Sequence, residues 1–168
     1  METKSQETKT GVPTLHMVCG KIASGKSTLT RQLADQPKTL LISEDEWLSR
    51  LYPGDINTVS DYVRCAARLR DIIGSHVEQL LGAGNSVVLD FPANTPATRQ
   101  WMRDIFSNAR AAHCLHYLNV SDEECKTRLR RRNEDGSHRF TTSEAEFDTI
   151  TGYFVAPSAD EGFNVVEA

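Results

Sequence analysis

The feature that most constrains this chain is the glycine-rich segment GKIASGKST, residues 20–28. Residues 20–27 match the pattern G-x-x-x-x-G-K-[ST], in which successive backbone N–H groups turn inward around a phosphate. The apolar run 14–19 before the segment predicts a strand, and residues 27–35 after it predict a helix whose positive N-terminus points at the phosphate. A random chain of this length would match the pattern in under roughly 1% of cases. We therefore interpret the segment as a nucleotide-binding P-loop rather than as a chance glycine turn.

The P-loop supplies the candidate contacts to a bound nucleotide. Lys26 is expected to reach the β- and γ-phosphates as a catalytic residue, and the Ser27 hydroxyl is expected to ligate Mg²⁺. ATP and Mg²⁺ are therefore the expected cofactors. The residues that we expect to bind the nucleotide are Gly20, Ala23, Ser24, Gly25, Lys26, Ser27 and Thr28.

Apolar runs alternate with helical patterns along the rest of the chain. The predicted strands are 38–43, 86–91, 113–120 and the final segment FNVVEA, and the predicted helices are 44–51, 59–81, 95–109, 121–133 and 144–154. Strands that are apolar throughout and alternate with helices indicate an α/β fold, with a parallel sheet covered on both faces. Ligands of such sheets bind beyond the carboxyl ends of the strands. We expect a flexible N-terminal tail over residues 1–12 and a single domain over residues 13–168.

Composition narrows the classes of partner and compartment. The 168 residues carry 19 basic and 23 acidic side chains, a net charge of −4, which disfavours a long nucleic-acid track without excluding a local basic cleft. No apolar stretch is long enough to span a membrane, and no signal-peptide core is present. The cysteines form no C-x-x-C pair and no zinc-like spacing with histidine, which predicts buried free thiols in a reducing cytoplasm. We expect a cytoplasmic monomer or homodimer. The cysteines are Cys19, Cys65, Cys114 and Cys125.

Acidic side chains follow two of the predicted strands. Phosphoryl transfer to an alcohol needs a carboxylate that orients the hydroxyl and accepts its proton. Asp45, in ISEDEW, is the favoured base, with Glu44 beside it as a substrate contact and Glu46 as a solvated first-turn residue. Asp90, at the end of VVLD, is expected to hold Mg²⁺ directly or through water, and a turn or helix-capping aspartate is the alternative.

Several arginines and one asparagine complete the candidate site. In CKTRLRRRNEDGSHRF, Arg128 and Arg132 are four residues apart, share a helix face and could clamp the migrating phosphoryl group. Their neighbours Arg130 and Arg131 fit a solvated face. The candidate substrate contacts, besides Glu44, are Arg64, Asn94 and Arg99.

Other P-loop classes fit less well. The guanine-reading N-K-x-D of GTPases is absent, and a motor ATPase domain would normally be larger. The chain resembles P-loop kinase-type ATP-binding proteins of the group often labelled AAA family ATPase, which is similar to zeta toxin, chloramphenicol phosphotransferase and the kinase domain of polynucleotide kinase. The segments that carry the resemblance are GKIASGKST, ISEDEWLSRLYP, VVLDFPANT, CKTRLRRRN and FTTSEAEFDTITGYFVAPSADEGFNVV.

The resemblance implies a three-layer P-loop NTPase fold with a five-stranded parallel sheet, helices on both faces and a small arginine-containing lid at about residues 132–142. It also implies Mg-ATP, Asp45 as the base, and Arg128 and Arg132 as lid arginines. We expect an ATP-dependent phosphotransferase acting on a small hydroxyl compound: a nucleoside, a sugar or an antibiotic. A 5′-hydroxyl polynucleotide kinase, and an ATP-binding switch or partner-binding module with slow hydrolysis, stay open as alternatives.

Overall fold

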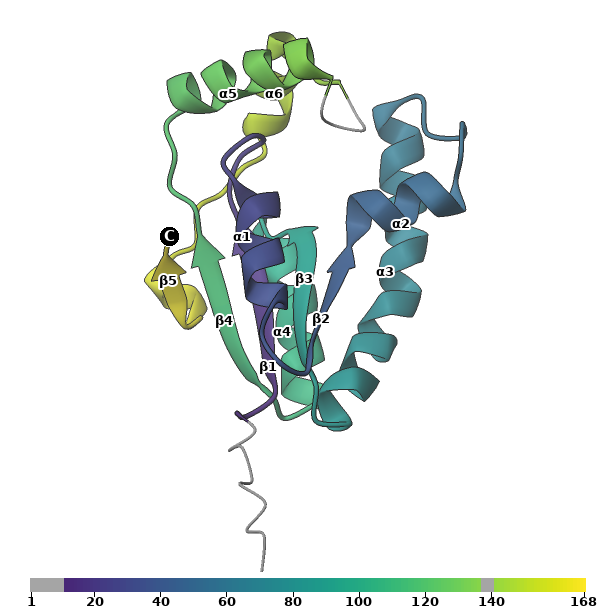
Figure 1. Cartoon of the computed structure of the whole chain (residues 1–168), viewed down its shortest axis with the longest axis vertical. Coiled ribbons are helices and arrows are strands. Elements are labelled where there is room, and N and C mark those ends of the chain that lie inside the picture. The colour runs from purple at the N-terminus through teal and green to yellow at the C-terminus, as the bar shows by residue number, and fades with distance from the viewer. Residues whose placement is uncertain (1–10, 137–140) are drawn as a thin grey trace, which may run out of the picture.

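The computed structural model describes residues 11–136 and 141–168, and in them the chain is built around a parallel sheet of five strands in the order β2-β3-β1-β4-β5 (Figure 1). The strands are β1 (Thr14–Cys19), β2 (Thr39–Ser43), β3 (Ser86–Pro92), β4 (Ala112–Tyr117) and β5 (Val165–Glu167). The helices are α1 (Lys26–Ala34), α2 (Glu44–Leu51), α3 (Val59–Gly82), α4 (Pro96–Asn108), α5 (Asp122–Asp135) and α6 (Glu144–Thr151), followed by a 3-10 turn at Ala159–Glu161. This topology confirms the predicted α/β fold.

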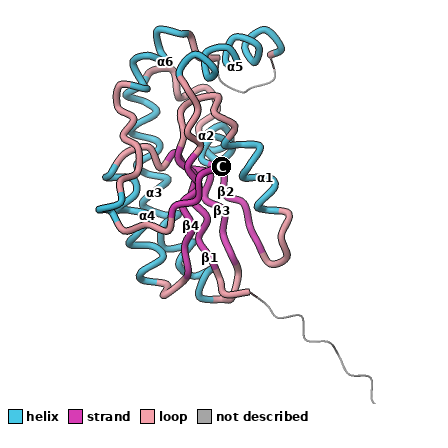
Figure 2. Tube along the Cα trace, turned by 90° about the vertical axis from the view of Figure 1, so that its left-hand side faces the viewer, coloured by secondary structure: helices cyan, strands magenta, loops and turns pink. Residues whose placement is uncertain are grey.

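Helices cover both faces of the sheet, which makes three layers. Figure 2 shows the sheet nearly edge-on, with α3 and α4 on one side, α1 on the other, and α5 and α6 beyond the carboxyl ends of the strands. The main core lies under α3 and α4, where Leu15 and Met17 of β1 are fully buried. Gly74 of α3 lets α4 approach closely, because a Cβ atom there would lie 3.3 Å from Nε1 of Trp101. Among the described residues, no helix has the length and apolar character needed to cross a bilayer.

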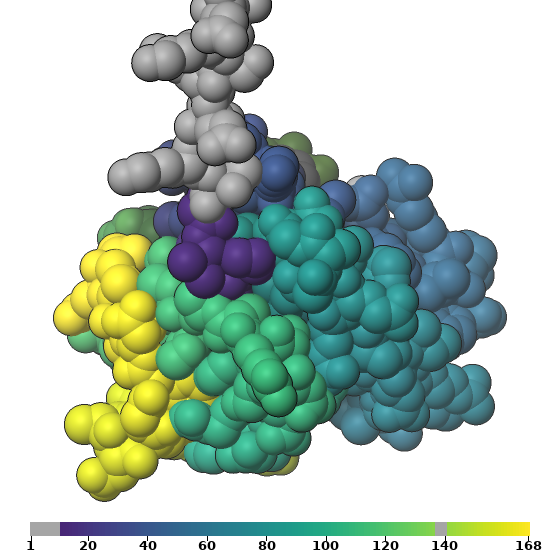
Figure 3. Space-filling view, turned by 90° about the horizontal axis from the view of Figure 1, so that it is seen from below, coloured from purple at the N-terminus to yellow at the C-terminus, as the bar shows by residue number. Residues whose placement is uncertain are grey.

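The amino-terminal ends of the strands form the end of the molecule opposite α5 and α6. The Thr14 N–H donates to Ser86 Oγ at 3.1 Å, and the Ala112 N–H donates to the Pro13 carbonyl at 3.0 Å. These bonds hold the start of β1 between β3 and β4. Figure 3 shows this segment in purple, between the teal and green parts of the chain. The carboxyl ends of the strands, which the candidate residues follow, therefore lie together at the opposite end of the sheet, near α5 and α6 (Figure 2).

The element boundaries differ from the prediction where the chain leaves the sheet. The strand predicted at 113–120 ends at Tyr117, and the Leu118 N–H donates to the Cys19 carbonyl as the chain turns toward α5. The helix predicted at 144–154 ends at Thr151. Residues 1–10 of the predicted tail, and residues 137–140 of the predicted lid, with Arg139, lie outside the described residues. The first part of the predicted lid is helical, because α5 continues to Asp135.

Arg99 is a structural residue at the centre of this arrangement and not the substrate contact that we expected. Its side chain is 0% exposed, and Nε and Nη2 donate to the two carboxylate oxygens of Glu161 at 2.7 and 2.9 Å. Nη1 donates to the carbonyls of Ala93 and Val155. The guanidinium of Arg99 therefore links the segment that contains Val155 and Glu161 to the residue after β3.

The Arg99–Glu161 pair predicts a stability defect. Glu161→Ala leaves the buried guanidinium without its counter-ion, which should lower the free energy of unfolding by about 3 kcal/mol, the lower end for a broken buried pair because Glu161 is 21% exposed. Chemical denaturation measures this. Asp160→Ala, in the same turn and exposed, is the matched control and should cost under about 0.5 kcal/mol.

The pH dependence of that defect separates charge from packing. The hydrogen bonds from Arg99 hold the pKa of Glu161 below its ordinary 4.5, so the carboxylate stabilises the fold fully above that value and less as the pH falls through the lowered pKa. The difference between the wild type and Glu161→Ala should therefore shrink in acid. A difference that does not change with pH would contradict this account.

Candidate functional site

The P-loop joins β1 to α1 through backbone conformations that favour glycine. Gly25 has φ +103°, in the left-handed region, and a Cβ atom at Gly20 would lie 2.5 Å from Ser24 Oγ. Gly25 is also the residue that precedes α1, and no side chain among the described residues caps the first turn of that helix. The first-turn N–H groups therefore have no side-chain acceptor and suit an anion.

Lys26 lies inside the curve of the loop. Its ammonium donates to the carbonyls of Gly20 and Lys21 at 2.6 and 2.7 Å. Burial lowers the pKa of Lys26 to about 8, and the carboxylates of Asp90 and Asp45 oppose that shift. The lysine is thus surrounded by the loop that would hold the phosphates, and its donors can exchange a carbonyl for a phosphate oxygen.

Asn94 closes the loop from the neighbouring strand, a role that the sequence did not reveal. Its Oδ1 accepts from the Gly20 N–H at 2.9 Å, and its Nδ2 donates to the Gly20 carbonyl at 2.8 Å. The side chain therefore satisfies both polar groups of the first P-loop glycine. We had expected Asn94 to contact the acceptor or to act as a turn residue, whereas in the structure it orders the loop backbone.

Two basic side chains connect the P-loop to the start of α5. Lys21 Nζ lies 2.6 Å from a carboxylate oxygen of Asp122 and donates to the Val120 carbonyl at 3.2 Å. Arg128 donates from Nη1 to the Ser24 carbonyl at 3.3 Å and from Nε to Glu124. The arginine-bearing helix is therefore held against the phosphate-binding loop, and Arg128 stands at the loop itself.

Asp90 and Ser27 are the side chains near the P-loop whose oxygen atoms could hold a metal ion. Asp90 ends the apolar stretch of β3, and the Ser27 hydroxyl stands in the first turn of α1, the helix that packs on β3. Burial and the Asp45 carboxylate raise the pKa of Asp90, while Lys26 and Arg31 oppose that shift. Hard oxygen donors of this kind fit Mg²⁺, whose charge would relieve the repulsion between the carboxylates. Ser27 and Asp90 would hold the ion.

Asp45 and Arg132 approach the site from α2 and α5. Asp45 is exposed in the first turn of α2, where the helix N-terminus favours a negative charge. Burial lowers the pKa of Arg132, and the charge of the Asp45 carboxylate opposes that shift. Arg132 Nε is buried and has no hydrogen-bond partner in the part of the chain that the structure describes. A buried donor of this kind suits a polar or anionic acceptor on an incoming ligand.

Glu44 is placed differently from the substrate contact that we expected. It is 1% exposed, accepts a short hydrogen bond from the Tyr62 hydroxyl, and lies 3.4 Å from Nη2 of Arg70. Burial raises its pKa, and the bonds from Tyr62 and Arg70 oppose that shift. Glu44 therefore anchors α2 to α3 beneath Asp45. Sequence reasoning missed Tyr62 and Arg70. They lie eight positions apart on α3, and no local motif connects either of them to Glu44.

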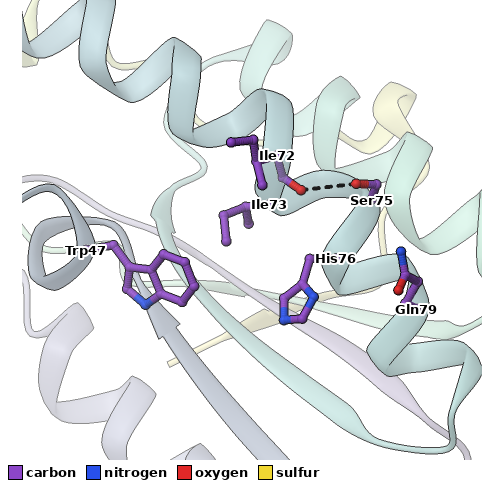
Figure 4. A pocket seen from close by; sticks show the side chains of 6 residues that line it. All are labelled: Trp47, Ile72, Ile73, Ser75, His76 and Gln79. Carbon is purple, nitrogen blue, oxygen red and sulfur yellow. Dashed lines mark hydrogen bonds between the residues drawn. The ribbon is translucent and has the colours of Figure 1, made fainter. Parts of the chain in front are cut away.

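The remaining candidate, Arg64, does not join the cluster. It is exposed on α3 and pairs with Asp61 in the first turn of the same helix at 3.0 Å. A hollow of about 380 Å³ between α2 and α3 also stands apart, since none of the candidate residues lines it. Figure 4 shows Trp47 and His76 facing each other across this hollow, with Ile73 above them. The candidate phosphate-binding site is therefore the group of residues at the carboxyl ends of the strands, around the P-loop.

Comparisons with known proteins agree with this geometry. A family model described as AAA domain matches residues 15–157. A candidate kinase from Chloroflexus aurantiacus gives a TM-score of 0.74 at 19% identity, covering 94% of this chain and 85% of that one. Kti12 of Chaetomium thermophilum, solved in complex with ADP-AlF3, gives 0.67 at 19% identity, covering 92% and 88%. A sugar kinase from Janibacter sp. gives 0.62 at 18% identity, covering 94% and 86%.

A search of curated proteins found no match. At these identities the solved structures establish the fold alone, which is that of P-loop kinases. The family model goes further, because it runs from β1 through the P-loop, both carboxylates and α5 to the segment after α6. The chain therefore belongs to the AAA domain family.

Proposed function

We propose that this protein is an ATP-dependent phosphotransferase that moves the γ-phosphate of Mg-ATP to a hydroxyl group of a small molecule of the nucleoside, sugar or antibiotic type. The observation that carries the proposal is that the Asp45 carboxylate acts electrostatically on both Lys26 of the P-loop and Arg132 of α5, whose Nε is buried without a hydrogen-bond partner among the described residues. A nucleotide switch needs the loop and the metal residues but has no use for a carboxylate that would orient and deprotonate a second reactant.

Each side chain has a role that its position supports. When bound, Mg²⁺ supplies positive charge at the β- and γ-phosphates, held by Ser27 and Asp90. Lys26 binds the same phosphates from within the loop, and Asn94 keeps the Gly20 peptide in place. Asp45 orients the acceptor hydroxyl and accepts its proton as the new O–P bond forms and the bond to the β-phosphate oxygen breaks.

The arginines of α5 act on the migrating group. Arg128 stands at the Ser24 carbonyl, and Arg132, from the next turn of the same helix face, has an Nε donor without a partner among the described residues. Guanidinium groups bind phosphate oxygens through paired N–H donors, and positive charge at the transferred group stabilises the transition state. The two arginines would also exclude water, which favours transfer over hydrolysis.

A first prediction concerns Lys26. Lys26→Ala should lower phosphoryl transfer by at least about 10²-fold and weaken ATP binding, because one preorganised electrostatic contact supplies on the order of 3 kcal/mol. Turnover and calorimetric ATP binding measure the two effects. The control is Lys38→Asn, at an exposed lysine with φ +54° that asparagine tolerates, which should leave both unchanged. Full turnover in Lys26→Ala would contradict the proposal.

A second prediction separates a base from a structural aspartate. Asp45→Asn should keep ATP affinity and melting temperature and lower transfer by roughly 10²–10⁴-fold, the range for a positioned base. Glu46→Gln, at the neighbouring carboxylate that pairs with Arg50, should retain transfer. A switch would show the same slow hydrolysis before and after the change, and a structural role for Asp45 would show as a lower melting temperature.

A third prediction uses the unpaired donor of Arg132. Arg132→Ala should lower transfer by about 10²–10³-fold, as for other transition-state donors. The melting temperature should change little, because the Nε atom has no partner in the described residues to lose. Arg131→Ala, at the adjacent exposed arginine, is the matched control. Equal transfer rates in the two variants would remove Arg132 from the mechanism.

A further inference from the structure

Three metal-ligating side chains meet on the sheet, away from the P-loop. His16 lies on β1, and Cys114 and His116 lie on β4. The parallel register pairs His16 with Cys114 and Val18 with His116, so the three side chains share one face. His16 Nδ1 lies 3.1 Å from His116 Nε2, and one ligand atom from each residue lies within 4.8 Å of the other two.

This face is opposite the main core. Leu15, Met17 and Cys19 alternate with His16 along β1 and belong to the core beneath α3 and α4. His16 and Cys114 are partly exposed, and His116 is 8% exposed. In Figure 1, α1 lies in front of β1 and β3, whereas no helix lies in front of β4. A small ion can therefore reach the cluster from solvent at the partly exposed His16 and Cys114.

The cluster is also separate from the proposed Mg²⁺ site. Cys19, which precedes the P-loop, is three positions after His16 on β1, and at about 3.3 Å per residue the two lie roughly 10 Å apart along the strand. The ligand types differ as well. Imidazole and thiolate groups suit Zn²⁺ and other borderline or soft cations, whereas Mg²⁺ prefers oxygen.

The spacing of the two ring nitrogens is close to that of two ligands of one tetrahedral ion. With Zn–N bonds of about 2.0–2.1 Å, two nitrogen ligands of one tetrahedral zinc lie about 3.3 Å apart, near the 3.1 Å between the two rings. The shared proton between the two nitrogens would move to the other nitrogen of its ring, and the Cys114 thiol would release its proton to water.

We propose that His16, Cys114 and His116 form a Zn²⁺ site with three protein ligands and a fourth position open to water. Two adjacent strands hold the ligands, so little order has to be created on binding. The sequence concealed the site, because His16 and His116 lie 100 positions apart, and the local pair Cys114 and His116 alone matches no zinc-like Cys/His spacing. Parallel pairing of β1 with β4 brings the three residues together.

Cobalt is the probe that tests the site directly, because a thiolate bound to Co²⁺ gives a near-ultraviolet charge-transfer band. The full chain, without affinity tag, nucleotide or thiol reductant, should bind one Co²⁺ with this band, and Zn²⁺ should displace it. Cys114→Ser should lose the band, and His16→Gln should weaken Co²⁺ binding by at least about 100-fold, the upper end for loss of a supporting partner alone. His76→Gln, at an exposed histidine on α3, is the control and should bind as the wild type does.

A second readout keeps the test independent of folding defects. Zn²⁺ should raise the melting temperature of the wild type and of His76→Gln, because it binds only the folded chain at this site, and should not raise that of Cys114→Ser. ATP binding by Cys114→Ser should be retained, which shows that the variant is folded. Absence of the charge-transfer band in the wild type, or an equal Zn²⁺ effect on Cys114→Ser, would overturn the proposal.

Discussion

The bend between Gly20 and Gly25 is the constraint on which the rest of this structure depends. Inward-turned N–H groups require backbone conformations and close contacts that a side chain would obstruct, as the 2.5 Å approach at Gly20 and the φ of +103° at Gly25 show. Such a bend persists only if its surroundings determine it. Here the side chain of Asn94 forms hydrogen bonds with both the N–H and the carbonyl of Gly20. The ammonium of Lys26 lies inside the loop and donates to the Gly20 carbonyl. The neighbouring strand and the first helix are thus parts of the loop's support.

The same constraint explains why the reactive side chains converge. A loop at the carboxyl end of β1 brings the ends of β2 and β3 to the same edge, where Asp45 and Asp90 follow their strands. Lys21 and Arg128 then hold α5 at the loop, and the charge of Asp45 acts on Arg132 of that helix. Burial, and after it the Asp45 carboxylate, raise the pKa of Asp90, so a negative charge at Asp90 is costly without a counter-ion. A metal-bound nucleotide would relieve it.

The sequence predicted the architecture well and the pairing of side chains poorly. The P-loop between a strand and a helix and the alternation of strands and helices follow from local patterns, and this architecture was confirmed. Charged side chains such as Arg99 and Glu44 are usually expected at the surface, yet both are buried here. Arg99 is paired with Glu161. Glu44 accepts a hydrogen bond from Tyr62 and is paired with Arg70, and both of these partners are distant in sequence. The histidine–cysteine cluster escaped notice for the same reason, since only the strand register joins its members.

The most direct test of the central claim follows the fate of the γ-phosphate. The purified chain is incubated with Mg²⁺ and γ-labelled ATP in the presence of nucleosides, sugars, aminoglycosides or short oligonucleotides, and the labelled products are separated. This account predicts that one class of small hydroxyl compound becomes labelled in excess of inorganic phosphate. Label found only as inorganic phosphate with every acceptor, or only on the oligonucleotide, would contradict it.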